Sequence, residues 1–269
     1  MAAGHWRHVV SGVLLLGLLV PAQAGGLPDG YNDPSWTVGG IVAVKPKYEG
    51  SKSYEVVGAP FLYPSFGGLG NNLMIRGVDD IRYRVINANG FMAGPLAGYN
   101  FGRDEDDGRR LAGLGDLDGG VVLGAFIGYR FAPWLVLDVS YHRTLSGDID
   151  GGQLRFGLET ETPLSQRVTL LGRVGATYAD DDYMASYFGV SAVQAGNSTF
   201  GLATYDAGAG IKDVHVELGA RILMDDRWSL KLSGRYGRLV GDAADSPIIE
   251  TEDQFSGSAS VSYKIGTLR

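Results

Sequence analysis

Apolar and polar residues alternate along several stretches of the chain, most regularly near its end. In residues 255–265, Phe255 and every second residue after it are apolar or glycine, and the residues between them are four serines and one lysine. Because successive residues of a strand point to opposite sides, this segment predicts a strand with one apolar face and one polar face. Residues 228–236 repeat the pattern, with Trp228 and Leu230 on one face and Ser229 and Lys231 on the other.

The same period of two, rather than a helical period, recurs along the rest of the chain. The expected strands are 36–45, 54–63, 72–76, 81–86, 91–103, 117–131, 133–143, 153–159, 168–178, 214–222, 228–236 and 255–265.

The connections between these segments fall into two classes. Those at 87–90, 132–133, 162–167 and 225–227 are tight and rich in turn residues, and only 64–71 is longer. The alternate connections at 46–53, 104–116, 146–151, 179–213 and 239–253 are long and polar, and only 78–80 is short. Short turns on one side and long loops on the other are typical of a bacterial outer-membrane barrel with both termini in the periplasm.

The predicted fold class is therefore all-β. We expect a transmembrane antiparallel up-and-down β-barrel of about 12 strands, with 10 or 14 as alternatives. Six aromatic residues at strand ends fit the two interfacial girdles of such a barrel. They are Trp36, Phe131, Trp134, Tyr178, Trp228 and Tyr236.

The amino terminus has the features of an export signal. Arg7 precedes an apolar stretch at 9–20, and Ala22-Gln23-Ala24 is a small-x-small cleavage site. We expect residues 1–24 to be a cleaved signal peptide, which implies the general secretory route. Residues 25–269 are then one barrel domain in the outer membrane of a Gram-negative cell, in contact with lipid and lipopolysaccharide and expected to be monomeric.

Composition narrows the candidate chemistry. The chain has no Cys, and after cleavage only His142 and His215 remain of its four histidines, so a metal site of the usual Cys or His type is not expected. The net charge of −7 argues against nucleic-acid binding. We expect no cofactor and no catalytic site.

The inward face of the predicted strands is basic. Two interpretations remain open: a narrow passive channel that attracts anions, or an interior filled by arginines paired with carboxylates. The predicted interior residues are Arg82, Arg84, Arg130, Arg155, Arg173, Arg221, Lys231, Arg235 and Lys264, facing Asp138, Glu159 and Glu217.

Two other groups of residues invite a functional interpretation. Ser140 and His142 share a strand face with Asp138, but residues two apart stand about 7 Å apart along a strand, too far for the Ser–His hydrogen bond of a hydrolase. The acidic clusters 104–107 and 180–182 begin two long loops. They offer ligands for divalent cations that bridge lipopolysaccharide, although solvated loops are the simpler interpretation.

Several loop motifs resemble the MltA-interacting protein (MipA/OmpV) family of outer-membrane proteins. The matching segments are 46–51, 102–106, 114–118, 124–126, 179–184, 187–190, 205–210 and 241–248. The resemblance covers nearly all of the predicted mature chain. It implies a barrel that acts as a scaffold, linking a lytic transglycosylase to a murein synthase, without catalytic residues of its own. The motif residues chosen as interaction candidates are Asp104, Asp106, Asp181, Asp182, Tyr183, Tyr205 and Asp206.

Overall fold

The alternating segments form long antiparallel strands in the computed structural model, which describes residues 36–64 and 72–266. The predicted signal peptide and most of the connection predicted at 64–71 lie outside the described residues. The strands are β1 (Trp36–Pro46), β2 (Tyr54–Pro64), β3 (Leu73–Gly77), β4 (Asp80–Tyr83), β5 (Ile86–Ala88), β6 (Phe91–Arg103), β7 (Leu117–Ala132), β8 (Leu135–Thr144), β9 (Gly152–Pro163), β10 (Val168–Ala179), β11 (Gly210–Leu223), β12 (Trp228–Leu239) and β13 (Asp253–Ile265).

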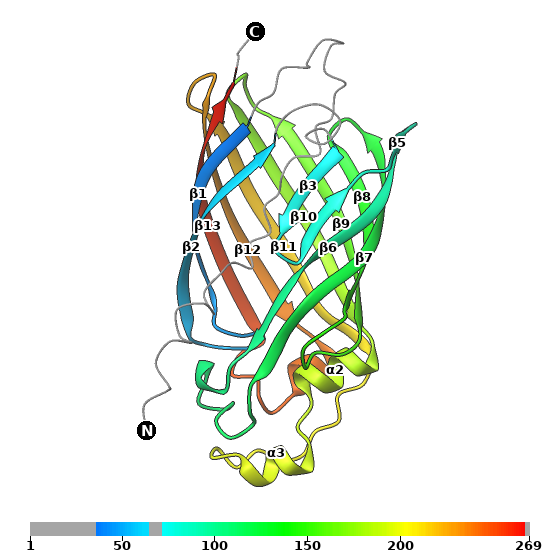
Figure 1. The fold of residues 1–269 in the computed structure, drawn as a ribbon, viewed down its shortest axis with the longest axis vertical. Helices are drawn as coiled ribbons and strands as arrows, with labels where there is room; N and C mark the ends of the chain where they lie inside the picture. The colour runs from blue at the N-terminus through cyan, green and yellow to red at the C-terminus, as the bar shows by residue number, and fades with distance from the viewer. Residues whose placement is uncertain (1–35, 65–71, 267–269) are drawn as a thin grey trace.

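The strands pair in the order β2-β1-β13-β12-β11-β10-β9-β8-β7-β6-β4-β3, with β5 also paired to β6. The sheet curls into a barrel (Figure 1). Within the described residues, no backbone ladder joins β2 to β3. The predicted strand 81–86 is split, because the Arg84 and Val85 amides donate to Asn72 and Ala93, which shifts the chain to new partners. β4 and β5 together occupy that predicted position.

The two faces of the wall are those predicted from the alternation. On β13, Phe255 and Ile265 are 55% and 47% exposed on the outer face, whereas Ser260 on the inner face is 8% exposed. Apolar side chains outside and polar side chains inside are the reverse of a water-soluble protein, and they match the lipid-facing surface of a membrane barrel.

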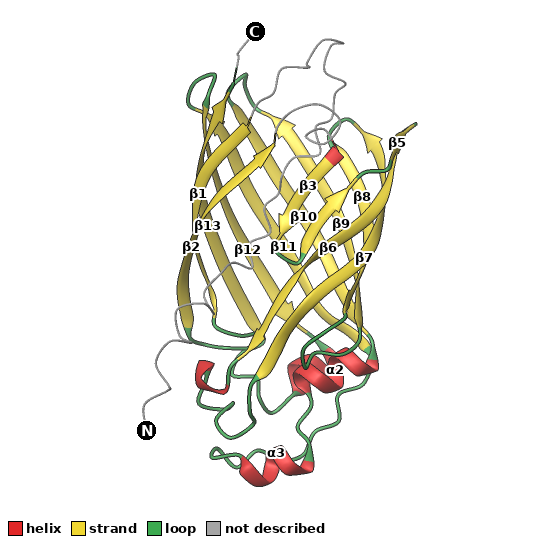
Figure 2. Cartoon of the chain, viewed as in Figure 1, coloured by secondary structure: helices red, strands yellow, loops and turns green. Residues whose placement is uncertain are grey.

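Short turns gather at one end of the barrel and long loops at the other (Figure 2). In the two-residue β5–β6 turn, Asn89 and Gly90 are both at positive φ, as a type I′ hairpin turn requires. The loops contain a 3-10 helix, η1 (Glu105–Asp107), and the helices α2 (Asp181–Phe188), α3 (Ala192–Asn197) and α4 (Gly241–Asp245). No helix in the described ranges is long and apolar enough to cross a membrane.

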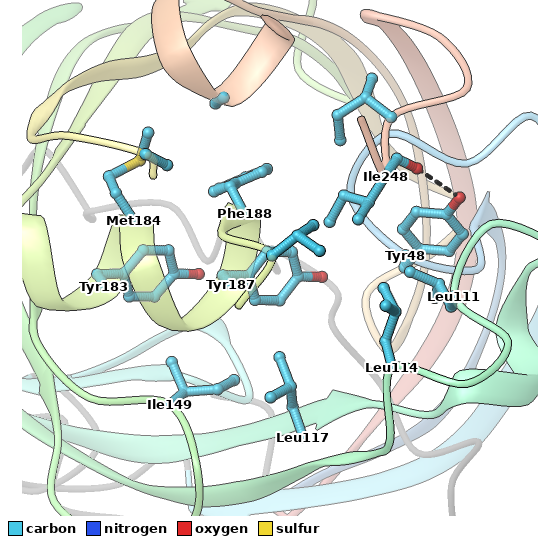
Figure 3. Close-up of a cluster of buried hydrophobic side chains, with 14 of the residues drawn as sticks. Tyr48, Leu111, Leu114, Leu117, Ile149, Tyr183, Met184, Tyr187, Phe188 and Ile248 are labelled. Carbon is cyan, nitrogen blue, oxygen red and sulfur yellow. Dashed lines mark hydrogen bonds between the residues drawn. The ribbon is translucent and has the colours of Figure 1, made fainter. Parts of the chain in front are cut away.

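The long loops pack together into a cap that closes their end of the barrel. Its core includes α2 residues such as Phe188 together with Tyr48, Leu111, Ile149 and Ile248 from four other loops, all almost fully buried (Figure 3). The Tyr48 hydroxyl donates to the Ile248 carbonyl at 3.1 Å, which ties the first long loop to the last. This cap is the largest apolar cluster in the described residues.

Candidate functional site

The hairpin of β3 and β4 folds into the lumen and crosses it. At its tip, Val78 packs against the inward-facing Ile41 and Val57 of β1 and β2. The neighbouring Asp79 carboxylate accepts a 2.6 Å hydrogen bond from Arg155 on β9. Four strands, β10 to β13, separate β1 from β9 in the sheet. The hairpin therefore touches two well-separated walls.

A network of buried ion pairs holds the hairpin to β8 and β9, and Arg173 of β10 shares the same carboxylates. The Asp138 carboxylate, 2% exposed, accepts hydrogen bonds from Arg82 at 2.8 Å, Arg173 at 3.2 Å and Arg76 at 3.3 Å. Arg76 and Arg173 also share the Glu159 carboxylate. Buried charges are costly unless paired and hydrogen-bonded, and this arrangement pairs them.

The carboxylates that complete this interior were missed by the sequence analysis. Arg82 makes a two-point contact with Asp80, at 2.6 and 2.8 Å, and Arg221 pairs with Glu161. The sequence places Asp79 and Asp80 in a short outer turn, whereas in the structure both carboxylates accept hydrogen bonds from interior arginines. The short acidic connection at 78–80, so unlike its long neighbours, was the one signal for an inward-folded hairpin.

A cavity of about 1160 Å³ lies between the hairpin and the cap. Arg76, Asp79 and Asp80 form part of its lining on the hairpin side, and Tyr183 and Tyr187 of α2 line it on the cap side. Of the predicted interior residues, Arg155, Arg173, Arg235 and Glu217 line it.

The other predicted interior residues lie elsewhere. Arg82 and Asp138 are part of the ion-pair network, and Arg221 lies in the half nearer the short turns, paired with Glu161. Arg84 is 6% exposed, and Arg130 approaches the Met92 sulfur. Lys231 and Lys264 alternate with exposed apolar residues on β12 and β13, on the inner face.

Ser140 and His142 contradict the spacing argument made from the sequence. The Ser140 Oγ atom and the His142 Nε2 atom are 2.9 Å apart, because the long imidazole leans along the strand toward its neighbour. Asp80 Oδ2 lies 3.9 Å from the same nitrogen. Ser140 and His142 are only 1% and 3% exposed, and Arg82 also donates to Ser140. Ser140 and His142 are therefore enclosed in the hairpin network, and neither lines the cavity.

The acidic loop motifs serve the backbone of the cap. Asp180 accepts from the amides of Tyr183 and Gly152 and so caps α2, while Asp181 accepts from the Ala209 amide at 2.6 Å. Asp104 begins η1 in a reciprocal cap with Asp107. Within the described residues, no group of three or more acidic, His or Cys side chains is arranged to hold a metal ion.

The remaining motif residues divide between the cap interior and its surface. Tyr183 stacks on Tyr187 at 5.9 Å between ring centroids, and Tyr205 donates to the Asp242 carbonyl at 2.9 Å. Burial, with Glu49 nearby, raises the pKa of Tyr187 to about 12 and also raises the pKa of Tyr183. Asp106, Asp182 and Asp206 are exposed.

The motifs that build the cap belong to a known family. The family model described as MltA-interacting protein MipA matches residues 38–265. The chain is a member of this MipA family. The match spans all the described strands and loops from β1 to β13, so barrel and cap together make up the family domain.

Two relatives are outer-membrane proteins of vibrios. Omp26La of Vibrio anguillarum is 34% identical over 98 residues, 36% of each chain. OmpV of Vibrio cholerae is 34% identical over 91 residues, 33% of each chain. These matches span about a third of the relatives' length. With the family match and the lipid-facing wall, they identify the protein as an outer-membrane β-barrel.

Solved structures of outer-membrane proteins also resemble the fold. The NanC porin is 11% identical with a TM-score of 0.41, covering 86% of this chain and 100% of the porin. The channel DcaP of Acinetobacter baumannii is 9% identical with a TM-score of 0.43, covering 90% of this chain and 100% of the channel.

Proposed function

We propose that this protein is a closed outer-membrane barrel that works as an interaction protein, with a lytic transglycosylase of the MltA type as its periplasmic partner. The barrel anchors the enzyme at the membrane and does not itself conduct. A murein synthase joins the same assembly. In this proposal the protein acts as a monomer and catalyses no reaction.

The observation that carries the proposal is the hairpin across the lumen. Its tip contacts β1 and β2 on one side, and its charged residues bind β8 and β9 on the other. The cap covers the far end of the barrel. Two barriers in series would prevent solutes from passing through the lumen, whereas a membrane anchor requires only a stable barrel wall. The family's description, MltA-interacting protein, supports the choice of partner.

The partner would meet the end with the short turns. In the predicted orientation the cap faces outward, so only the short turns and the strand ends beside them face the periplasm. Exposed polar residues there include Arg227 and Asp226 in the β11–β12 turn and Ser165 in the β9–β10 turn.

The test is a pull-down with purified components. The tagged barrel in neutral detergent is mixed with a purified MltA-type lytic transglycosylase, alone and together with a bifunctional murein synthase. The proposal expects recovery of the transglycosylase, and weaker recovery by a variant with altered turns (Asp226→Lys and Ser165→Lys). A variant altered in the exposed cap, Val193→Lys, serves as the matched control and should bind like the wild type. Equal recovery by a folded barrel of an unrelated family would count against the proposal.

The cavity supports a second candidate, a narrow channel for small solutes. Its volume of about 1160 Å³ is large enough for a solute, and Arg173 and Arg235 line it. Conduction would require both the hairpin and the cap to move aside. This candidate predicts discrete current steps in planar bilayers, with an anion preference that falls in Arg173→Gln and Arg235→Gln. Silence over many insertions of folded protein would rule it out.

A further inference from the structure

Three neutral polar side chains line the cavity where β9 and β10 meet α2. Gln153 of β9, Thr177 of β10 and Tyr183 of α2 are only 6%, 4% and 3% exposed. Thr177 lies opposite Arg155 in the β9–β10 ladder, and Gln153 shares the inner face with Arg155, two residues away. The Asp180 carboxylate accepts from the Tyr183 amide and from the backbone at the start of β9, which fixes α2 over these strand ends. The three side chains therefore line one corner of the cavity.

Each of the three carries a hydrogen-bonding group that the described part of the chain does not use. The Oε1 atom of Gln153 accepts two hydrogen bonds from Arg155, both at 3.2 Å, which leaves the amide nitrogen of Gln153 with two free N–H groups. The hydroxyls of Thr177 and Tyr183 have no hydrogen-bond partner in those residues. The fully enclosed side-chain atoms that lack a partner there are all arginine Nε atoms, so these three groups are open to the cavity. Buried polar groups are normally hydrogen-bonded, so the cavity has to supply their partners.

The charged side chains around this corner are engaged with one another. Arg155 donates to Asp79 at 2.6 Å. Lys212 lies 2.6 Å from the Glu49 carboxylate and 3.0 Å from that of Asp213. A charged ligand would have to compete with these ion pairs, whereas a neutral ligand leaves them intact. Because an alcohol group both donates and accepts, a ligand with several hydroxyls matches the free amide and the two free hydroxyls.

The cavity is large enough for such a ligand and reaches the protein surface. Its volume of about 1160 Å³ slightly exceeds the range of about 300–1,000 Å³ that is usual for small-molecule pockets. Its lining also includes the exposed Asp106 and Arg238, whose side chain is 48% exposed, so the cavity can be entered beside the cap. Carboxylates such as that of Asp106 disfavour anionic solutes at this entrance.

We propose that this corner of the cavity binds a small neutral polyol, such as a mono- or disaccharide from the water outside the cell, with Gln153, Thr177 and Tyr183 as its hydrogen-bond partners. Ordered water occupies the same groups when no polyol is bound, and one polyol replaces several such waters. The site is separate from the proposed periplasmic interaction and does not depend on conduction. Its loss would leave transglycosylase binding unchanged.

Binding is measured by equilibrium dialysis of labelled maltose against the folded barrel in tetraethylene glycol octyl ether, a neutral detergent without a sugar group. The comparison solute is maltose methylated at every hydroxyl, which keeps the two rings and removes every donor. The proposal predicts saturable binding of maltose and at least about tenfold weaker binding of the methylated form, because the two hydroxyls of the site then lose their donors.

The site is tested with variants that keep the shape of each side chain and remove its polar group. Gln153→Leu, Thr177→Val and Tyr183→Phe should each weaken maltose binding about threefold to tenfold, and the triple variant at least about thirtyfold. Tyr205→Phe is the matched control, since the Tyr205 hydroxyl lies in the cap but does not line the cavity, and it should bind like the wild type.

Three results would overturn the proposal. The first is no saturable maltose binding by the folded wild type, which would mean that the cavity holds water only. The second is equal binding of the methylated form. The third is unchanged binding by the single variants and the triple variant when heat-modifiable migration on a gel shows that they are folded. None of these results bears on recovery of the transglycosylase, so the two proposals fail independently.

Discussion

Removing the Asp138 carboxylate should release the hairpin from the lumen wall. Asp138 accepts charge-assisted hydrogen bonds from Arg76, Arg82 and Arg173 at 2.8 to 3.3 Å. Breaking a buried ionic network by removing one partner typically costs about 3–5 kcal/mol. Because Glu159 and Asp80 still hold these arginines, we take the lower value, about 3 kcal/mol for Asp138→Ala. At 1.4 kcal/mol per tenfold change, the detached hairpin becomes roughly 100-fold more populated.

The assay uses a single thiol at the hairpin tip. Val78→Cys introduces the only Cys of the chain, at a position packed against Ile41 and Val57. Val78 is half-buried, so part of the reaction with a water-soluble maleimide occurs in the packed state, and the rest follows the population of the detached state when opening and closing are fast. Adding Asp138→Ala should raise the second part about 100-fold and so increase the total rate well above that of the parent. The matched control, Glu161→Gln, breaks an interior ion pair that does not involve the hairpin. A rate within about threefold of the Val78→Cys parent, in a folded barrel, would refute the reasoning.

Three further predictions follow from the hairpin and the cap. Gly98→Val should also expose Val78→Cys to maleimide, because a Cβ at Gly98 meets the backbone of Val78 and Asp79, and Gly237→Val, which has only ordinary contacts, is the control. Tyr187→Ala removes the stack with Tyr183 and the cation–π contact with Arg103 and should cost about 3–5 kcal/mol, seen as faster tryptic cleavage after the exposed Arg109. Because burial raises the pKa of Tyr187 to about 12 from 10.0, the folded cap holds the Tyr187 proton more tightly than the unfolded chain does. The free energy of unfolding of the cap is therefore unaffected below pH 10 and falls by roughly 2–3 kcal/mol by pH 12. Near-ultraviolet circular dichroism melts at pH 9 and 11 should show about half of this loss, roughly 1.4 kcal/mol, and Tyr187→Phe should reduce it.

The wall of the barrel could be predicted from the sequence because its signal is local. Alternation in 228–236 fixes which side of β12 faces lipid, and a slip of one residue would reverse every side chain. The sharp difference between turns such as 225–227 and loops such as 179–213 fixes the up-and-down path. Each signal lies within a short segment of the sequence, so neither depends on contacts between residues that are far apart in the chain.

The interior could not be predicted in the same way because its partners are far apart in the chain. Arg76 meets Asp138 across 62 positions and Glu159 across 83. The strands at 72–76 and 81–86 alternate like wall strands, and nothing local shows that their hairpin turns inward. The carboxylates of Asp79 and Asp80 were consequently placed outside, and the predicted interior looked more basic than it is.

The cap could not be predicted from the sequence for a related reason. Its apolar residues are scattered singly through polar loops, as with Leu111, Ile149 and Ile248, and no periodicity marks them. Only the folded chain brings them together. The Ser140–His142 contact could not be predicted for a different reason. The spacing of the backbone along a strand does not give the distance between the ends of two side chains.

The central claim is that the hairpin closes the lumen, and single-channel recording tests it most directly. Folded wild-type protein, verified by heat-modifiable migration on a gel, is inserted into planar bilayers beside the Asp138→Ala variant and the Asp138→Ala/Tyr187→Ala double variant. The account predicts no steps for the wild type and intermittent steps for the double variant, because Asp138→Ala frees the hairpin from β8 and Tyr187→Ala loosens the cap that covers the other end. Regular, stable steps from the wild type would show an open lumen and contradict the account.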